Sequence, residues 1–248
     1  DRLTFEEADV LSLEVDDPSV PAGPENLVLR AARALAEAAD VRPRAAITLE
    51  KRIPAGGGLG GGSSDAAAAL LALSELWGLG LSAVPLAEVG AKVGSDVPYF
   101  LFGGTARGLG RGERIEPLED FPPRGVVLVM PPFPAATPEV FRRLGAPPWN
   151  GLPAAAGSAL PDRNDLEPAA EALFPALRAV REALATAGAL QARLSGSGST
   201  VFGLFPDAGS AAEAARRLEG LPAGSAVRVV PTWTREECRL RGGARRAE

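Results

Sequence analysis

Residues 51–70 read KRIPAGGGLGGGSSDAAAAL, and this stretch decides how the rest of the chain is interpreted. Six glycines lie between 45–54, which alternates like a strand, and 66–77, which has the apolar spacing of a helix. Glycine lets the backbone approach a ligand closely and adopt positive φ, and the following helix places the positive end of its dipole at the same point. The stretch therefore predicts an anion site, whose usual occupant is a triphosphate.

The residues expected to bind this nucleotide are those of the glycine-rich loop and the two hydroxyls after it. They are Pro54, Gly56, Gly57, Gly58, Leu59, Gly60, Gly61, Gly62, Ser63 and Ser64. Ser63 and Ser64 can donate to phosphate oxygens or place a hydroxyl on Mg²⁺. With Asp65 they also suit the N-cap and first turn of the helix. For Asp65, a structural role at the helix N-terminus and support of Mg²⁺ weigh equally.

Three other interpretations of the loop are weaker. A glycine turn that only packs a helix on a sheet does not need so many glycines in this strand-loop-helix context. The dinucleotide fingerprint can be forced onto Gly56, Gly58 and Gly61, but no repeated βαβ pattern follows. The P-loop fails because Gly62 and Ser63 stand where a phosphate-binding lysine and its Ser or Thr are required. We expect a phosphate cradle of another family.

Composition favours a folded protein that does not bind nucleic acid. Of 248 residues, 46% are hydrophobic, and 26 basic against 31 acidic residues give a net charge of −5. A nucleic-acid footprint needs a clustered basic face. The only basic concentration, 235–246, is interrupted by glutamates and is expected to be a solvated tail.

The residue types that are rare or missing exclude further classes. Cys238 is the only cysteine, so an intrachain disulfide is impossible and a reducing compartment fits. No apolar stretch has membrane-spanning length and no secretory start is present, so we expect a cytoplasmic protein without a membrane partner. The chain has no histidine, which removes His-based triads and most zinc sites, and we assign no metal ligands.

The pattern along the chain predicts an α+β protein. Strands are expected within 2–14, 45–54, 125–132, 190–206 and 226–233, and helices from Asn26 onward and over 66–77, 85–93, 166–187 and 210–218. Residues 145–163 are rich in Ala, Pro and Gly and are expected to form a loop. The order of elements in the last third favours an antiparallel sheet.

The glycine-rich stretch resembles the ATP-binding motif of the GHMP kinase family. Its GGGSSDAA form is typical of the branch that acts on 4-diphosphocytidyl-2-C-methyl-D-erythritol. Other segments resemble further family motifs, in the family's order: ENLVLRAARAL (25–35), GSDVPYFLFGGTARGLGRGERIEPL (94–118), NDLEPAA (164–170) and LSGSGSTVFGLF (194–205). Any single match can arise by chance, whereas an ordered series across nearly the whole chain does not.

The resemblance implies a fold and a function. The fold is the α+β, two-domain GHMP kinase fold, with a ribosomal protein S5 domain 2-like N-terminal domain over 1–122, truncated at its start, and a ferredoxin-like C-terminal domain over 123–248. The function is ATP- and Mg²⁺-dependent phosphorylation of the 2-hydroxyl of 4-diphosphocytidyl-2-C-methyl-D-erythritol in non-mevalonate isoprenoid biosynthesis. The alternatives are another GHMP small-molecule kinase and an inactive nucleotide-binding fragment.

The resemblance also assigns roles to single residues. It makes Asp96 the catalytic aspartate that orients or deprotonates the acceptor hydroxyl, where a capping aspartate is the alternative. It places Gly196, Ser197 and Gly198 in a turn that closes over the phosphates or the substrate, where a plain hairpin turn is the alternative. It makes Phe141 the aromatic ring that stacks on the cytosine, and ordinary core packing of Phe141 is as well supported.

One expected segment has no counterpart in the sequence. The family's N-terminal segment carries a lysine that partners the catalytic aspartate and a Tyr-His pair that engages the cytosine. Lys51 and Lys92 are the only lysines, and neither stands in the matching context. We therefore expect Asp96 to lack its cationic partner here. The chain is then expected either to bind ATP but turn over poorly, or to fold incompletely through loss of a strand.

Overall fold

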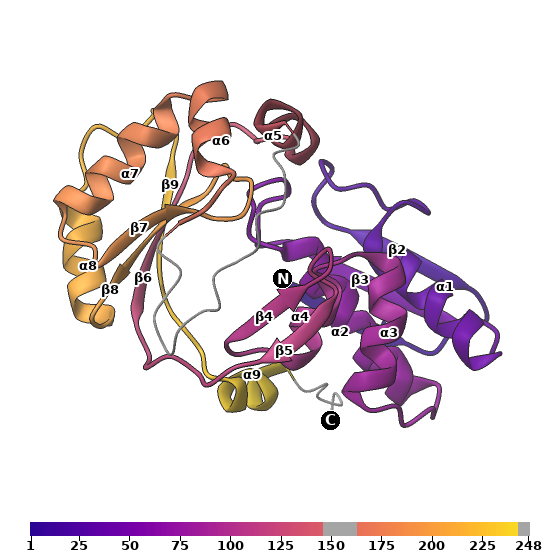
Figure 1. Ribbon diagram of the computed structural model, residues 1–248. Coiled ribbons are helices and arrows are strands. Elements are labelled where there is room, and N and C mark those ends of the chain that lie inside the picture. Colours follow the sequence, from indigo (N-terminus) through magenta and orange to yellow (C-terminus); the bar gives the residue numbers. More distant parts are fainter. Residues whose placement is uncertain (146–162, 243–248) are drawn as a thin grey trace. The chain divides into compact units, whose positions relative to one another are not determined.

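The computed structural model describes residues 1–145 and 163–242, which form two compact units (Figure 1). Unit 1 contains Asp1–Ala55, Gly60–Asp120 and the described residues from Trp233 onward. Unit 2 contains Gly56–Leu59 and the described residues of Phe121–Thr232.

Unit 1 is built on a three-stranded sheet covered by helices. Its strands are β1 (Arg2–Glu6), β2 (Leu11–Val15) and β3 (Ala45–Glu50) in the order β1-β3-β2. β3 runs antiparallel to β1 and parallel to β2. The helices are α1 (Leu27–Ala39), α2 (Gly61–Leu76), α3 (Ala83–Val93) and α4 (Val97–Phe102). A hairpin of β4 (Ala106–Leu109) and β5 (Arg114–Pro117) follows, and α9 (Arg235–Gly242) completes the unit.

The core of unit 1 follows from the two periodicities in its sequence. Alternate residues of β3, among them Ile47 and Leu49, are buried, as a half-covered strand requires. Leu35 of α1 and Leu70 of α2 pack in the same cluster. α1 begins as predicted at Asn26, whose Oδ1 accepts a hydrogen bond from the backbone N–H of Val28 at 2.9 Å.

Unit 2 is a four-stranded antiparallel sheet with helices against it. The strands are β6 (Gly125–Met130), β7 (Gln191–Leu194), β8 (Val201–Phe205) and β9 (Ala226–Pro231), in the order β7-β8-β6-β9. The helices are α5 (Thr137–Leu144), α6 (Glu167–Leu173), α7 (Ala176–Thr186) and α8 (Ala208–Arg217). α7 and α8 pack against the sheet (Figure 1). Helices connect β6 to β7, a hairpin joins β7 to β8, and α8 connects β8 to β9. With this strand order, these connections give the predicted ferredoxin-like topology.

Several predicted elements differ in detail from the structure. The helix expected over 166–187 is divided into α6 and α7, since Pro175 lies at the start of α7 and cannot continue the preceding helix. The loop segment around Asp96 leads directly into α4, and the β4–β5 hairpin was not predicted. Most of the loop expected over 145–163 lies outside the described residues.

The two units do not follow the predicted boundaries of 1–122 and 123–248. The backbone N–H of Arg235 donates to Asp120 at 2.7 Å, and its guanidinium donates to the carbonyl of Thr105 at 2.6 Å. These contacts hold α9 on unit 1, so the prediction of a solvated tail beginning at Arg235 was wrong for this residue. Gly56–Leu59 belong to unit 2, because they contact the turn after β7.

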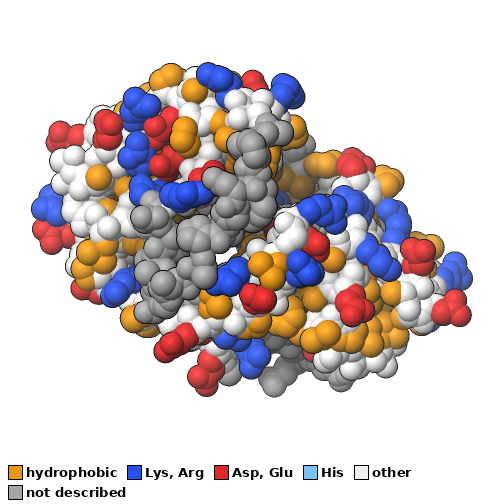
Figure 2. Space-filling model, viewed as in Figure 1, with side chains coloured by type: hydrophobic (Ala, Val, Ile, Leu, Met, Phe, Trp, Pro, Cys, Tyr) orange, Lys and Arg blue, Asp and Glu red, His pale blue; other side chains and the backbone are white. Residues whose placement is uncertain are grey.

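The surface carries charges of both signs. Figure 2 shows acidic and basic side chains interspersed on the face that it draws. Within residues 1–145 and 163–242, no helix combines the length and the apolar character that crossing a bilayer requires.

Replacing Leu70 by Ala is expected to lower the free energy of unfolding by about 2–5 kcal/mol, because the fully buried side chain leaves a cavity. Chemical denaturation followed by circular dichroism measures the change. Val84→Ala is the control, since Val84 is 60% exposed and a surface substitution shifts stability by about 0.5 kcal/mol or less. Equal effects of the two substitutions would contradict the placement of Leu70 in the core.

Candidate functional site

The glycine-rich loop has a backbone conformation that only glycine adopts easily. Gly56, Gly58 and Gly60 have φ of 71°, 74° and 69°. A Cβ on Gly58 would lie 2.3 Å from the carbonyl oxygen of Ser195 and 2.7 Å from that of Gly198. Both the dihedral angle and the lack of space therefore require glycine at position 58.

Residues at the turn that connects β7 to β8 donate hydrogen bonds to backbone carbonyls of this loop. Ser195 Oγ donates to the carbonyl of Gly58 at 2.8 Å, and the N–H of Thr200 donates to the carbonyl of Gly57 at 3.1 Å. All of these residues belong to unit 2. These contacts fix the backbone of the loop at Gly57 and Gly58.

The predicted residues Gly196, Ser197 and Gly198 lie in the same turn. Gly196 and Gly198 have φ of 57° and 88°, as a tight turn requires. Ser197 is buried, and its Oγ lies 2.7 Å from Thr137 Oγ1 at the start of α5. The turn closes a β-hairpin, as the alternative interpretation predicted, and also contacts the glycine-rich loop, while its role over phosphates or substrate stays a prediction.

Helix α2 begins at the end of the glycine-rich loop without a capping side chain. Its N-cap is Gly60, and the helix starts at Gly61, earlier than the predicted Ser63 to Asp65. The first N–H groups of an α-helix have no partners within the helix, and the dipole makes this end positive. Because glycine offers no side-chain oxygen, these N–H groups are available to an anion.

The two serines of the loop lie in the first turn of α2. Ser64 Oγ donates to the carbonyl of Gly61 at 2.7 Å, and both hydroxyls are half-buried. Pro54 is exposed and Leu59 is half-buried beside the glycines. The structure thus brings Gly60 to Ser64 together at one helix end, preceded by Gly56 to Leu59 along the chain.

A buried ion cluster lies beside the start of α2. Lys51 Nζ donates to Asp1 Oδ2 at 2.6 Å and to Asp65 Oδ2 at 2.8 Å. The three side chains are only 6%, 2% and 4% exposed, respectively. The other carboxylate oxygen of Asp1 accepts from the N–H of Ile53 at 2.7 Å and from that of Arg52. The cluster ties the segment after β3 to α2 at Asp65, just after the first turn of that helix.

The cluster supports the structural one of the two roles that the sequence left open for Asp65. One of its carboxylate oxygens is bonded to a buried ammonium, and breaking such a pair leaves a charge without compensation in a low dielectric. Support of Mg²⁺ by Asp65 stays a prediction.

Asp96 occupies the N-cap position of α4 but does not act as a cap. Its side chain is exposed and makes no capping hydrogen bond to the helix. Nearby on α4, the Tyr99 hydroxyl donates to the carbonyl of Gly104 at 2.9 Å, and burial raises the pKa of Tyr99. A carboxylate exposed in this way can accept a hydrogen bond or a proton from a substrate hydroxyl.

Phe141 lies on α5 and is 52% exposed, whereas its neighbour Val140 is fully buried. Core packing of Phe141, one of its two predicted roles, does not apply. The aromatic contact inside unit 2 is made by Phe133 and Phe174, whose stacked rings have centroids 5.3 Å apart. The ring of Phe141 therefore has an open face.

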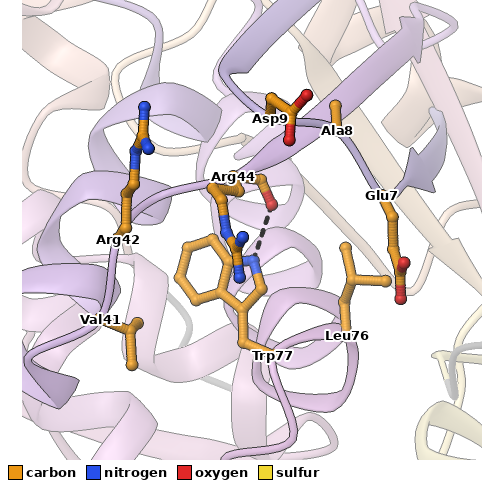
Figure 3. A pocket seen from close by; sticks show the side chains of 8 residues that line it. All are labelled: Glu7, Ala8, Asp9, Val41, Arg42, Arg44, Leu76 and Trp77. Atoms are coloured by element: carbon orange, nitrogen blue, oxygen red, sulfur yellow. Dashed lines mark hydrogen bonds between the residues drawn. The ribbon is translucent and has the colours of Figure 1, made fainter.

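A separate pocket of about 530 Å³ lies elsewhere in unit 1 (Figure 3). It is lined by Glu7, Ala8, Asp9, Val41, Arg42, Arg44, Leu76 and Trp77. Trp77 Nε1 donates to the carbonyl of Arg44 at 2.9 Å. The pocket adjoins the first residue of β3 and the last residues of α2, and the ends of this 16-residue helix lie about 24 Å apart. It is distinct from the anion site, and its lining charges have both signs.

The described residues contain no group of three or more His, Cys, Asp or Glu side chains that could hold a metal ion. Mg²⁺ keeps several waters and is held by one or two carboxylates or, at phosphate-binding loops, by a Ser or Thr hydroxyl, together with substrate phosphates. The hydroxyls of Ser63 and Ser64 at the helix start fit this mode of binding. Mg²⁺ therefore fits the site as a companion of a nucleotide and not as an ion in a protein cage.

Sequence reasoning missed the residues that support the loop. Ser195 and Thr200 bind the backbone of Gly57 and Gly58 across more than 130 positions, which no local pattern reports. Lys51 offered a weak signal, because it directly follows a predicted strand and precedes the glycine-rich loop. Its carboxylate partners, Asp1 and Asp65, could not be predicted from the sequence, because only the folded chain brings them to Lys51.

Comparison with known proteins places these features in one family. Residues 26–104 match the GHMP kinases N terminal domain, and residues 149–222 match the GHMP kinases C terminal family. A 4-diphosphocytidyl-2-C-methyl-D-erythritol kinase from Pelotomaculum thermopropionicum is 46% identical over 232 residues, which cover 88% of this chain and 80% of that protein.

Solved structures agree with this assignment. The crystal structure of a 4-(cytidine 5'-diphospho)-2C-methyl-D-erythritol kinase matches with a TM-score of 0.72 and 38% identity, over 93% of this chain and 84% of that one. A homoserine kinase from Cytophaga hutchinsonii matches with a TM-score of 0.73 but 18% identity, over 94% of this chain and 85% of that one. The second likeness shows a common fold alone. The predicted two-domain α+β fold and the family resemblance are confirmed.

Gly58→Ala is expected to weaken binding of ATP by at least tenfold, because the new methyl group would collide with two carbonyls and displace the loop. Isothermal calorimetry with MgATP measures the dissociation constant. Gly78→Ala is a matched control, since Gly78 also has a positive φ of 67° but has open space where a Cβ would stand. Both variants carry the dihedral penalty, so equal ATP affinities would show that the close approach at Gly58 does not shape the loop.

Lys51→Met is expected to lower the free energy of unfolding by about 3–5 kcal/mol, because it leaves the carboxylates of Asp1 and Asp65 buried without a cation. Urea denaturation measures this loss. Lys92→Met serves as the comparison, since Lys92 is exposed and its replacement is expected to change stability by about 0.5 kcal/mol or less. A Lys51 variant as stable as the Lys92 variant would rule out a supporting role for the cluster.

Proposed function

The chain belongs to the GHMP kinase family, and on that basis we propose that it transfers the γ-phosphate of ATP to the 2-hydroxyl of 4-diphosphocytidyl-2-C-methyl-D-erythritol. This reaction is a step of non-mevalonate isoprenoid biosynthesis. One observation carries the proposal: a glycine loop with a steric requirement for glycine lies at an uncapped helix start, in a chain 46% identical to a kinase of that name.

The phosphates of ATP bind at the glycine-rich loop and the start of α2. Backbone N–H groups from Gly60 to Ser63 and the positive end of the helix dipole neutralise part of the triphosphate charge. The Ser63 hydroxyl donates to a phosphate oxygen or reaches the Mg²⁺ that accompanies the nucleotide. Ser64 Oγ donates its proton to the carbonyl of Gly61, so it contributes its lone pairs, as an oxygen ligand of that Mg²⁺. When bound, Mg²⁺ supplies further neutralisation of the phosphate oxygens.

Asp96 acts on the acceptor hydroxyl. Phosphoryl transfer demands little covalent chemistry from the protein, so orienting the nucleophile and neutralising the phosphates provide most of the rate. The exposed carboxylate of Asp96 accepts the proton of the 2-hydroxyl or holds that hydroxyl in line with the γ-phosphate. The family resemblance assigns the cationic partner of Asp96 to an N-terminal segment that precedes the residues matched here.

The acceptor is held by unit 2. The open face of Phe141 stacks on the cytosine ring, a favourable arrangement for a flat base. The start of the same helix is bonded to the turn after β7 through Thr137 and Ser197, so Gly196, Ser197 and Gly198 stand beside the helix that presents Phe141. This arrangement supports binding of a substrate with a cytidine moiety.

A different GHMP acceptor is the alternative within the family. The ferredoxin-like half and the glycine-rich loop do not distinguish acceptors, since a homoserine kinase shares the fold at 18% identity. The identity of 46% to a 4-diphosphocytidyl-2-C-methyl-D-erythritol kinase favours that substrate over the others.

A coupled ADP-release assay with 4-diphosphocytidyl-2-C-methyl-D-erythritol tests the proposal. It is run on the 248-residue chain and on the same chain preceded by the family's N-terminal segment. Substrate-dependent ADP release is expected from the extended chain. Asp96→Asn is expected to lower kcat by about 10²–10⁴-fold, because the amide cannot accept the proton.

Glu88→Gln is the control for this variant, since Glu88 is an exposed carboxylate on the neighbouring helix α3 and its loss should leave kcat unchanged. Failure of a folded, ATP-binding extended chain to release ADP with this acceptor would refute the substrate assignment. Homoserine and mevalonate would then be assayed as acceptors.

A further inference from the structure

We infer that Asn164 is a positioning residue for the nucleotide site: its side-chain amide fixes the turn after β7, and that turn fixes the backbone of Gly57 and Gly58. The inference rests on the proposed function and deepens it, since it extends the ATP site to a residue outside the glycine-rich loop. Asn164 lies in the segment NDLEPAA, which resembles a family motif.

Every hydrogen-bonding atom of the Asn164 side chain is engaged. Nδ2 donates to the carbonyl of Leu194 at 3.0 Å and to that of Gly196 at 2.8 Å. Oδ1 accepts from the N–H of Leu166 at 2.9 Å, just before α6. The amide thus bridges the start of α6 to the two carbonyls on either side of Ser195. An Asn side chain has the two donors and one acceptor that this bridge requires.

A second side chain from the same segment holds the same strand end. Glu167 Oε2 accepts from the N–H of Leu194 at 2.9 Å. Asn164 and Glu167 therefore bind the carbonyl and the N–H of the last residue of β7. The position at which the turn leaves the sheet is set by two side chains of the NDLEPAA segment.

The turn has two backbone hydrogen bonds of its own, from the N–H of Gly198 to the carbonyl of Ser195 and from the N–H of Ser195 to that of Thr200. Asn164 adds support from outside the turn. Gly196 and Gly198 have no side chains and adopt positive φ, so the turn loses much conformational freedom when it orders. Ser195 stands between the two carbonyls that Asn164 binds, and its Oγ donates to the carbonyl of Gly58 at 2.8 Å.

A continuous set of hydrogen bonds therefore runs from Asn164 to the glycine-rich loop. It passes from the Asn164 amide to the backbone around Ser195, and from Ser195 Oγ to Gly58, with Thr200 bonded in parallel to Gly57. All of these residues lie in unit 2. A loop held in its binding conformation before the ligand arrives loses less entropy on binding, so Asn164 raises ATP affinity without touching ATP.

Asn164→Asp is the informative substitution. Aspartate keeps the shape and the oxygen that accepts from Leu166, but it replaces the two donated hydrogen bonds by a carboxylate facing two carbonyl oxygens. Asp165→Asn is the matched control, because Asp165 is exposed and its carboxylate is bonded to the exposed Arg163 at 2.9 Å.

The test measures the dissociation constant of MgATP by calorimetry and the hydrogen exchange of peptides that cover 56–59 and 195–200, on the 248-residue chain. Asn164→Asp is expected to weaken ATP binding by about tenfold and to speed exchange in both peptides, while Asp165→Asn changes neither. Loss of thermal stability with unchanged ATP affinity and unchanged exchange at 56–59 would overturn the inference and leave Asn164 as a structural residue.

Two further arms keep the result interpretable. If Asn164→Asp does not fold, Asn164→Ser is used, since a hydroxyl can still accept from Leu166 but is too short to reach both carbonyls; the same weakening is expected, and unchanged affinity overturns the inference. Because the readout is ATP binding, inactivity of the unsubstituted chain towards 4-diphosphocytidyl-2-C-methyl-D-erythritol would count against the proposed acceptor and not against the role of Asn164.

Discussion

The close contact between the backbone of the glycine-rich loop and the turn after β7 is the constraint on which the site depends. A Cβ on residue 58 would lie only 2.3 Å from the carbonyl oxygen of Ser195 and 2.7 Å from that of Gly198. This contact requires glycine at position 58, and glycine in turn leaves the loop without side chains on its ligand-facing surface. The same absence of side chains that admits a phosphate makes the loop dependent on other segments for its shape.

That dependence explains where the polar side chains around the loop are placed. Ser195 and Thr200 bind its backbone directly, and Asn164 and Glu167 bind the strand end from which the turn begins. Each is a side chain or N–H that satisfies a backbone group, and buried backbone groups are costly to leave without partners. The hydrogen bonds that order the glycine-rich loop therefore come from segments that are distant in sequence.

In unit 1, the start of α2 is ordered by charge. Lys51 lies between two carboxylates at the point where β3 ends and α2 begins, and all three groups are almost fully buried. A buried ion pair of this kind adds little net stability over an apolar replacement, but it is costly to break and so favours one arrangement of its elements. In this protein it fixes the start of α2, whose N–H groups face the proposed phosphate site.

The family and the two-domain α+β fold could be predicted from the sequence, together with a candidate anion site, because these predictions depend on local signals. Apolar periodicity, Asn26 as a cap and the glycine run are read within a few residues of each other. Even there, the helix after the loop began earlier than predicted, since Gly60 and not a serine is its N-cap.

Which polar groups contact one another could not be predicted from the sequence and follows from the folded structure. Lys51 pairs with carboxylates 50 and 14 positions away, and Ser195 binds a carbonyl 137 positions away. The return of α9 to unit 1 through Arg235 is likewise a long-range contact. Such partners are chosen by the approach of distant segments in the folded chain, and a pattern along the sequence carries no information about that approach.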